Sequence, residues 1–322
     1  MDADSPSGTS TKPSLKGRRR PIERAIVISL FVAGAVSIAI TVGILWELGK
    51  ESLLFFQDEE VSFWGFLTTT TWQPQAGVFG IWPLILGTML ITIIALMVAV
   101  PIGLASAIYL SEYAGTRVRG ILKPTLEVLV GIPTVVFGFF AITFMTPLLR
   151  SIFGTSNVGF FNVLSAGIVV GFLIVPLISS LAEDAMAAVP NSLRQAAYAV
   201  GASKLEVSLR IVVPAAISGI AAGIVVAMSR AIGETMVVTL AAGASPRNFN
   251  LGSDSVFGTI LNPFQGAQTM TGYIAITASG DLSYNTIDYN SIFAIGLTLF
   301  LITLGLNSLS RRIVKRFRQE YE

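Results

Sequence analysis

Long apolar runs separated by polar segments are the dominant pattern of this chain. Six of these runs reach the roughly 20 residues that a helix needs to cross the hydrocarbon core of a bilayer. They are Ala25–Leu48, Trp82–Leu110, Thr125–Leu149, Val163–Leu181, Ile211–Ala242 and Ser291–Leu309. The runs are continuously apolar and lack the alternation of membrane-barrel strands, so they predict helices. The expected fold class is an all-α polytopic membrane protein with six transmembrane helices.

Composition supports this fold class and sets the domain boundaries. Hydrophobic residues make up 53% of the chain and charged residues 12%, and the mean hydropathy of +0.73 lies outside the range of soluble domains. The polar segment 1–24 contains Arg18-Arg19-Arg20 and is expected to be a disordered basic cytoplasmic tail. The first apolar run is too long for the core of a signal peptide, which indicates an uncleaved span. Residues 25–310 then form one membrane domain, followed by a basic cytoplasmic tail at 311–322.

The distribution of basic residues predicts the orientation, because Lys and Arg are retained on the cytoplasmic side of a membrane. With the N-terminus inside, 17 of the 21 Lys and Arg fall in cytoplasmic segments. These are Lys12, Lys16, Arg18, Arg19, Arg20, Arg24, Arg117, Arg119, Lys123, Arg194, Lys204, Arg210, Arg311, Arg312, Lys315, Arg316 and Arg318. Both termini and the segment between the fourth and fifth runs are therefore expected in the cytoplasm. The basic residues of the C-terminal tail are attributed to this orientation and to anionic membrane lipid, and not to nucleic acid.

Residue types that several chemistries need are absent from the chain. There are no cysteines and no histidines, which excludes disulfides, thiol nucleophiles and the usual zinc and haem sites. An ATP-binding loop needs Gly-x4-Gly-Lys-Ser/Thr, whereas the single Gly-Lys pair, Gly49-Lys50, is followed by Glu51 on the external side. We expect a transport subunit that is not an enzyme and has no cofactor or metal, with ATP handled by a partner protein.

Two long external loops connect the predicted spans. The first, Gly49–Ile81, carries six aromatic residues of the kind found at a membrane–water interface. They are Phe55, Phe56, Phe63, Trp64, Phe66 and Trp72. The second, Gly243–Tyr289, is rich in Asn, Ser, Gly and Thr, and its length predicts ordered structure. Within it, Phe264–Ala278 is apolar enough for a surface or re-entrant helix.

A polar, helix-prone segment lies between the fourth and fifth runs and reads Gln195-Ala196-Ala197-x3-Gly201-x9-Ile211-x-Val213-Pro214. Small residues at its start give a helix a face that another protein can approach closely. Pro214 interrupts backbone hydrogen bonding near the point where the chain re-enters the membrane. A short helix held between two spans transmits a push to both, so the segment is a candidate contact for a cytosolic partner.

The fifth run carries the main candidate for transport chemistry. Arg230 and Glu234 lie four residues apart, which on a continuous helix places them on one face where they can pair. An ionised side chain at this depth costs about 2.5–3.5 kcal/mol on insertion scales, so it is expected to face a partner or water. One interpretation is a pair that fixes helix packing. The other is that Arg230 lines a translocation path and binds an anion, with Glu234 orienting it. Glu127 in the third run is a weaker candidate, which Lys123 can neutralise.

Small residues also form a stripe along the fifth run. Gly219, Gly223, Ala227 and Ala231 follow one another at intervals of four residues. Such a stripe lets a second helix pack closely against the first. The stripe therefore predicts a tight helix–helix contact within the membrane domain.

The Gln195–Pro214 segment resembles the EAA loop of ABC importer permeases, whose pattern is Glu-Ala-Ala-x3-Gly-x9-Ile-x-Leu-Pro. Gln195 replaces the Glu and Val213 replaces the Leu of that pattern. Three further stretches resemble the phosphate-specific ABC importer permeases, and the long first external loop resembles the C-type member of the paired permeases. The stretches are Glu127-x3-Gly131-Ile132-Pro133-Thr134-Val135-Val136-Phe137-Gly138, Ala187-x-Val189-Pro190 and Ser229-Arg230-Ala231-Ile232-Gly233-Glu234-Thr235.

This resemblance implies a type I ABC importer permease fold in a bacterial plasma membrane and the import of inorganic phosphate. The implied partners are an A-type sister permease that completes a heterodimeric pore, two cytosolic ATPase subunits and an extracytoplasmic phosphate-binding protein. A coupling helix at about 190–204 would dock on the ATPase. The residues implied for coupling are Arg194, Gln195, Ala196, Ala197, Gly201, Ala202, Lys204 and Pro214. Members of the family carry a transport-essential arginine and glutamate at the positions of Arg230 and Glu234.

Other functions remain open on the residues alone. A positive charge in the path suits sulfate or molybdate as well as phosphate, so the anion rests on the resemblance. A secondary anion transporter would show charges over several spans or inverted halves, neither of which is visible. A channel would leave the cytoplasmic helix without a role, and an intramembrane hydrolase lacks His, Cys and a Gly-x-Ser-x-Gly motif.

Overall fold

The computed structural model describes residues 21–250, 252, 255–280, 283 and 286–317. Most of the predicted N-terminal tail and residues 318–322 of the predicted C-terminal tail lie outside the described residues. The chain forms two compact units, Met1–Glu47 and Leu48–Glu322, which are treated separately below.

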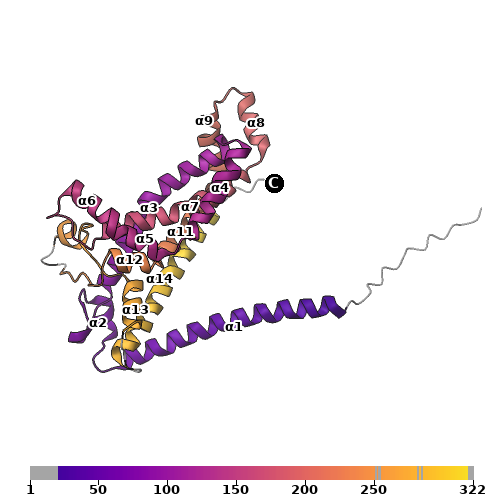
Figure 1. Ribbon diagram of the computed structural model, residues 1–322. Coiled ribbons are helices and arrows are strands. Elements are labelled where there is room, and N and C mark those ends of the chain that lie inside the picture. Colours follow the sequence, from indigo (N-terminus) through magenta and orange to yellow (C-terminus); the bar gives the residue numbers. More distant parts are fainter. Residues whose placement is uncertain (1–20, 251, 253–254, 281–282, 284–285, 318–322) are drawn as a thin grey trace, which may run out of the picture. The chain divides into compact units, whose positions relative to one another are not determined.

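Helices make up nearly all of the regular structure in the described residues, together with one short antiparallel hairpin (Figure 1). The elements are α1 (Pro21–Gln57), α2 (Phe63–Thr68), β1 (Trp72–Gln73), η1 (Pro74–Ala76), β2 (Val78–Phe79), α3 (Trp82–Ile108), η2 (Tyr109–Tyr113), α4 (Thr116–Val130), α5 (Thr134–Phe140), η3 (Ala141–Met145), α6 (Thr146–Phe153), α7 (Val163–Ala187), α8 (Asn191–Ala199), α9 (Lys204–Glu206), η4 (Val207–Val212), α10 (Val213–Ala215), α11 (Ile217–Ile232), α12 (Met236–Ala241), η5 (Val256–Ile260), α13 (Met270–Ala278) and α14 (Ile287–Phe317). η1 is a 3-10 turn, and η2 to η5 are π-helical turns.

The first unit consists, within the described residues, of the N-terminal part of α1. Pro21 opens this helix, at a position where the missing N–H of proline costs nothing. Large apolar side chains point outward all round it, with Leu30, Phe31 and Trp46 68%, 75% and 73% exposed. A helix that is apolar on every side is stable only in an apolar environment, so α1 is a membrane span. It begins four residues before the predicted Ala25.

The core of the second unit is the contact between α3 and α7. Both helices are apolar along their length, and glycines let their backbones come close. A Cβ on Gly167 would lie 2.6 Å from Ile94, and one on Gly103 would lie 2.8 Å from Ile178. Such distances are shorter than real side chains tolerate, so the two glycines allow α3 and α7 to pack this tightly. α7 is thereby the most buried of the spans formed by a single helix, since 72% of the residues in its most apolar stretch are buried.

The small-residue stripe on α11 packs against α7, as the sequence predicts. A Cβ on Gly219 would lie 2.5 Å from that of Ala185, and one on Gly223 would lie 2.9 Å from that of Leu181. Further along the stripe, Ala227 and Ala231 are buried at 0% and 3% exposure. The stripe therefore joins α11 to the central helix of the unit.

The third apolar run differs from its predicted extent of Thr125–Leu149. α4 ends at Val130 and a new helix begins at Thr134, so the apolar span is Thr134–Phe153. Pro133 explains the break, because it lacks a backbone donor and disfavours helical geometry at Ile132. α4 is consequently a separate amphipathic helix that carries Arg117, Arg119 and Lys123, and not the start of a span.

The fifth run is also broken where a continuous span over Ile211–Ala242 is predicted. Lys204–Ala215 and Ile217–Ile232 meet at an angle of 71°, directly after Pro214. The helix then stops at Ile232, and α12 starts at Met236 after a short non-helical link. Proline and Gly233 account for the two breaks, because one removes a hydrogen-bond donor and the other lowers helix propensity.

The predicted number of six spans agrees with the structure when this bent pair is counted as one span. Within the described residues, five single helices and the bent pair are long and apolar enough to cross a membrane. The single helices are Glu23–Gln57, Trp82–Tyr113, Thr134–Phe153, Val163–Ala187 and Ile287–Arg312. α14 continues as a helix to Phe317, past the predicted boundary at residue 310.

The first loop forms a packed aromatic core instead of lying flat at an interface. Phe55, Phe66 and Trp72 are 0%, 3% and 1% exposed and meet edge to face, whereas Phe63 and Trp64 stay on the surface. Edge-to-face pairs add about 0.5–1.5 kcal/mol each beyond the area they bury. The membrane-interface interpretation is therefore wrong for the buried rings and stays a prediction for the exposed ones. This core lies at the end of the unit that carries α2 and α13, opposite the end that carries α8 and α9 (Figure 1).

The second loop is ordered around α13 and one arginine. α13 covers Met270–Ala278, so the predicted helix over Phe264–Ala278 begins six residues later than expected. Arg247 donates hydrogen bonds to the carbonyl oxygens of Asn262, Gln265 and Gly266 at 2.7, 2.6 and 2.8 Å. Burial lowers the pKa of its guanidinium. Arg247 therefore holds this loop in its conformation through hydrogen bonds to backbone carbonyl oxygens.

Candidate functional site

The predicted coupling helix is α8, which is shorter than the expected 190–204. Pro190 precedes its first residue, and Gly201 ends the turn after it with φ of +84°. Residues with a side chain rarely adopt that left-handed conformation, which explains the glycine of the motif. The amide of Ala202 then donates to the carbonyl of Ala197 at 3.1 Å, which closes the turn.

Arg194 fastens α8 to the rest of the unit. Its guanidinium contacts the Glu112 carboxylate at 2.9 Å and donates to the carbonyl oxygens of Met186 and Val189 at 2.8 and 2.6 Å. The side chains of Arg194 and Glu112 are 14% and 5% exposed. Charge-assisted, partly buried bonds of this kind are the stronger ones in proteins. Arg194 therefore positions α8 from inside, whereas the sequence predicts a contact for the ATPase at this residue.

The outer surface of α8 carries the other coupling candidates. Gln195 and Ala196 are exposed, whereas Ala197 is buried at 8% and packs into the unit. Tyr198 and Val200 are 44% and 85% exposed. An exposed valine next to an exposed tyrosine on a short polar helix is typical of a protein contact. Of the predicted Ala-Ala pair, only the first residue is available to a partner.

The segment after α8 is held by its own local bonds. Ser203 and Glu206 form a reciprocal capping box, and the hydrogen bonds from Ser203 lower the pKa of the Glu206 carboxyl. Lys204 lies over the ring of Tyr113 at 4.9 Å from its centroid, which ties this segment to η2, the π-helical turn that follows α3. Pro214 lies in α10 at the bend of the fifth span. The predicted coupling residues thus follow one continuous path from α8 to the bent span.

Arg230 and Glu234 do not pair directly. Because α11 ends at Ile232, Glu234 lies in the non-helical link that follows and not on the helix of Arg230, and no salt bridge joins them in the described part of the chain. Glu234 is buried at 7%, and its Oε1 accepts a hydrogen bond of 3.3 Å from the amide of Val237, at the start of α12. Arg230 is exposed near the end of α11. Glu234 thus stabilises the helix break, while the positive charge of Arg230 stays uncompensated within the described residues.

Glu127 is exposed on α4 and is not neutralised by Lys123. The ammonium of Lys123 instead contacts the carboxylates of Glu183 and Asp184 on α7, at 2.6 and 2.5 Å. Glu127 therefore lies on an amphipathic helix outside the apolar spans. Within the described residues, no hydrogen bond or ion pair joins it to Arg230 or Glu234.

A buried charge cluster at the end of α7 is the main feature that the sequence did not indicate. Glu183 is fully buried, and its carboxylate contacts Arg119 and Lys123 of α4. Burial lowers the pKa of Lys123, but hydrogen bonds and charges from Asp184 and Glu183 outweigh it, so the pKa is raised. We call these four residues, Arg119, Lys123, Glu183 and Asp184, the α4–α7 charge cluster. The four-residue spacing of Arg119 and Lys123 marks one helix face, but nothing in the sequence identifies their partners some 60 residues away.

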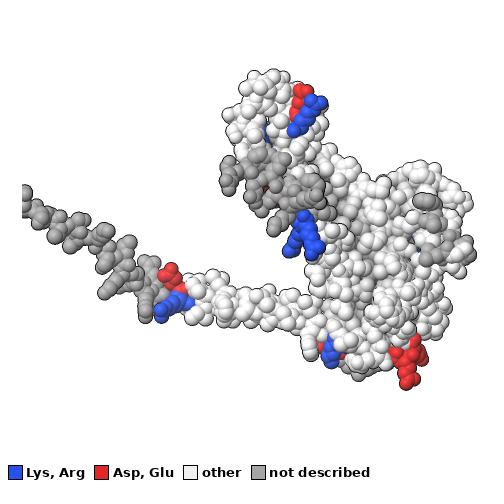
Figure 2. Space-filling model, turned by 180° about the vertical axis from the view of Figure 1, so that it is seen from behind, with Lys and Arg blue, Asp and Glu red and all other residues white. Residues whose placement is uncertain are grey.

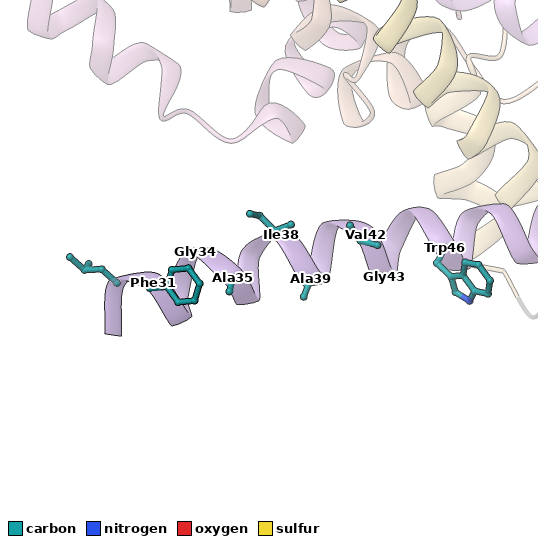
Figure 3. Close-up of a pocket in the computed structure, with 9 residues that line it drawn as sticks. Phe31, Gly34, Ala35, Ile38, Ala39, Val42, Gly43 and Trp46 are labelled. Atoms are coloured by element: carbon teal, nitrogen blue, oxygen red, sulfur yellow. The ribbon is translucent and has the colours of Figure 1, made fainter. Parts of the chain in front are cut away.

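A groove runs along one face of α1 in the first unit (Figure 3). Small residues such as Gly34, Ala35 and Ala39 form its floor between larger apolar side chains such as Ile38 and Trp46. It holds no charged side chain, so it suits lipid or another membrane helix and not an anion. In the described residues, no group of three or more Asp or Glu is arranged to hold a metal ion.

Comparison with known proteins places these features in a family. Residues 99–319 match the model of the binding-protein-dependent transport system inner membrane component family. The chain belongs to this family. It is 34% identical over 283 residues to a probable ABC transporter permease protein, YqgH, of Bacillus subtilis, covering 86% of this chain and 87% of that one. It is 28% identical over 328 residues to the phosphate transport system permease protein PstC of Mesorhizobium japonicum, covering 94% and 95%.

Solved structures share the fold at low sequence identity. A bacterial alginate ABC transporter structure, in complex with a pentasaccharide-bound periplasmic protein, contains a chain with a TM-score of 0.61 and 14% identity, covering 94% of this chain and 98% of that one. The MetNI methionine ABC transporter in an inward-facing conformation gives a TM-score of 0.52 at 16% identity, covering 74% and 95%. The protein is therefore a multi-pass ABC importer permease of the PstC type, with the type I permease fold.

Proposed function

We propose that this permease imports inorganic phosphate and that Arg230 lies in the translocation path. The observation that carries the proposal is an exposed arginine near the end of a membrane helix, without a carboxylate partner among the described residues. Such a cation is costly in a bilayer unless water or an anion accompanies it. Because Glu234 is engaged with the start of α12, it leaves the charge of Arg230 available to an incoming anion.

Phosphate is favoured over other anions by the relatives. Several proteins with 28–30% identity over most of the chain are named phosphate transport system permease proteins. A planar guanidinium binds the oxygen atoms of phosphate in a bidentate manner, which suits this role for Arg230. Sulfate and molybdate offer similar oxygen atoms, so a permease for one of these oxyanions is the second candidate.

The proposed partners follow from the two ends of the second unit. One of two ATPase subunits docks on α8 from the cytoplasm, with Gln195, Ala196, Tyr198 and Val200 at the contact, and the second docks on the sister permease. An A-type sister permease completes the pore, and an extracytoplasmic binding protein delivers the anion at the opposite end. This orientation places both termini in the cytoplasm of a bacterium, as the basic residues predict.

The proposed mechanism is alternating access driven by α8. ATP binding by the partner subunits draws the two coupling helices of the dimer together. Arg194 passes this movement to α7 and η2, and Lys204 to Pro214 pass it to the bent fifth span. The path then opens outward, and ATP hydrolysis restores the inward-facing state.

Uptake of radiolabelled phosphate by vesicles that contain the complete transporter tests this proposal. Arg230→Gln is compared with Arg117→Gln, an exposed arginine on α4, at equal amounts of assembled complex. We expect Arg230→Gln to lose about tenfold or more of the uptake rate, because one charge-assisted contact to the anion is removed, and Arg117→Gln to keep it. Equal uptake rates of the two variants would show that Arg230 does not lie in the translocation path.

The same vesicles separate phosphate from the alternatives. Excess unlabelled phosphate should abolish the uptake signal, whereas equal concentrations of sulfate or molybdate should leave it nearly unchanged. Uptake that continues without ATP would indicate a secondary transporter. Inhibition by sulfate or molybdate at the same concentration as phosphate would assign the permease to another oxyanion.

A further inference from the structure

A polar pocket of about 430 Å³ lies at the end of the second unit opposite α8 (Figure 1). Four segments build it: the β1–η1 turn, the stretch after α12, α13 and the first turn of α14. The segments are joined to one another. The amide of Trp72 donates to Asn248 Oδ1 at 2.8 Å, and the hydroxyl of Thr70 donates to the carbonyl of Phe249 at 2.6 Å. The pocket is thus preformed by bonds between the two long loops, and its volume is typical of ligand sites.

One ionisable carboxylate lines this pocket, and no Lys or Arg does. Asp288 on α14 forms no ion pair within the described residues, and its buried Oδ1 has no hydrogen-bond partner there. An acidic residue in the first turn of a helix often caps that helix. Here Thr286 already does so, since its hydroxyl accepts a hydrogen bond from the amide of Tyr289 at 3.3 Å. The Asp288 carboxylate is therefore not needed for the helix.

Neighbouring groups in the pocket do not satisfy Asp288 either. The hydroxyl of Ser291 donates to the backbone carbonyl of Asp288 at 2.7 Å, so the hydroxyl of Tyr273 donates to Ser291 Oγ at 3.1 Å. Burial raises the pKa of Tyr273, which keeps this hydroxyl protonated and engaged. Oδ1 of Asp288 is thus an acceptor without a donor among the described residues, in a pocket otherwise lined by side-chain amides, two hydroxyls, aromatic rings and small or apolar side chains. Its missing partner is a cation with hydrogen-bond donors.

The surface around the pocket carries the same sign of charge. Asp58, Glu59 and Glu60 are exposed, and the Glu60 carboxylate lies against Gly77, the residue that ends η1. Figure 2 shows acidic side chains gathered at this end, on a surface that otherwise has few charges. An acidic surface attracts a basic partner and repels a free anion such as phosphate.

We propose that this pocket binds a lysine or arginine side chain of the extracytoplasmic binding protein, with Asp288 as its counter-ion. This inference rests on the proposed function for the presence of that partner and for the orientation. It adds a specific contact to the docking. It also assigns a second role to the acidic end, which is to keep free phosphate away while it attracts the loaded binding protein.

Binding of the purified binding protein to the complete transporter in nanodiscs tests this contact. Asp288→Asn is compared with Glu59→Gln, which removes one charge from the same end outside the pocket. We expect Asp288→Asn to weaken the affinity about tenfold, mainly through faster dissociation, because a buried charge pair is lost. Glu59→Gln should change the affinity less than about twofold, mainly through slower association. Equal effects of the two substitutions would overturn the proposal, because general attraction would then explain them.

A second variant does not depend on Asp288. Thr277→Arg places a basic side chain of the permease itself in the pocket, where it can pair with Asp288. We expect it to weaken binding as much as Asp288→Asn does, in a complex of unchanged melting temperature. Unaltered binding by Thr277→Arg would overturn the proposal. A different outcome would identify a small polyamine as the occupant and overturn the proposal. In that case spermidine would raise the melting temperature of the wild-type complex but not that of Asp288→Asn, and Asp288→Asn would bind the binding protein as tightly as the wild type does.

Uptake measurements distinguish this contact from the transported anion. At saturating binding protein, Asp288→Asn should import phosphate at the wild-type maximal rate, with a half-saturating concentration of binding protein about tenfold higher. If the wild-type complex imports no phosphate, the proposed function fails while the binding comparison still decides the role of Asp288.

Discussion

The two ends of the second unit use charge in opposite ways. At the α8 end, charged side chains pair within the chain: Arg194 with Glu112, and Glu183 with Arg119 and Lys123. At the other end, aromatic rings and backbone carbonyls hold the structure together. Glu51 there pairs with the neighbouring Lys50 at 3.1 Å, but Asp58, Glu59, Glu60 and Asp288 have no ion pair within the described residues.

This difference fits two kinds of mechanical task. Paired, buried charges have strong geometric preferences, so under the proposed mechanism they would carry a displacement of α8 to α7 and η2. The unpaired acidic side chains beside the aromatic core are instead available to another protein, and their negative charge attracts a basic partner over long distances. Under the proposed function, the end that contacts the ATPase is the one whose charges pair within the chain, and the end that contacts the binding protein is the one with unpaired acidic side chains.

The largest expected effect is the loss of the α4–α7 charge cluster. Glu183→Ala leaves two cations without their buried partner, which costs about 3–5 kcal/mol of stability. The melting temperature of the complex should fall, and the ATPase activity of the complex should no longer respond to binding protein. Asp184→Ala is the matched control, because that carboxylate is 59% exposed and contacts Lys123 alone. A fall of equal size in the control would show that burial of Glu183 is not what matters.

A smaller effect is expected at the anchor of α8. Arg194→Ala removes the bonds to Glu112, Met186 and Val189, and we expect a total cost of about 1.5–3 kcal/mol, the contribution of one charged hydrogen bond, because water reaches this partly exposed position. The complex should still hydrolyse ATP, but phosphate uptake per ATP should decrease, because α8 moves without α7. Arg210→Ala, at a position where the side chain is 79% exposed, should keep normal coupling. Normal coupling in Arg194→Ala would restrict Arg194 to a passive role.

The smallest effect concerns pH. The pKa of Lys123 is raised in the folded protein above its ordinary value of 10.5, so its contribution to stability is complete below that pH. The contribution is lost as the pH rises through the folded-state pKa. The melting temperature should therefore decrease more steeply above about pH 10.5 in the wild type than in Lys123→Gln. Parallel curves for the two proteins would mean that the cluster does not depend on the lysine charge.

The sequence predicts well those features that depend on a few neighbouring residues. Apolar runs of span length identify the membrane helices, and the Gln195–Pro214 and Ser229–Thr235 motifs identify the permease family, which the comparisons confirm. The small-residue stripe on α11 correctly predicts a close helix contact. The extent of the third and fifth runs was wrong, although Pro133, Pro214 and Gly233 were present in them. A proline or glycine permits a break, but tertiary packing decides whether a helix bends, ends or continues, as α3 does through Pro101.

What the sequence by itself determined is the number of membrane spans and the type of protein, because hydropathy and short motifs are local properties of the chain. Only the tertiary structure decided that Arg194 points inward to Glu112, that Lys123 pairs with Glu183 and not with Glu127, and that Arg230 and Glu234 are separated by a helix break. These outcomes depend on residues that lie 60 to 82 positions apart, or on whether a helix continues through a weak point. The energy of a charge depends on the partner and the burial that folding provides, and neither can be read from its neighbours along the chain.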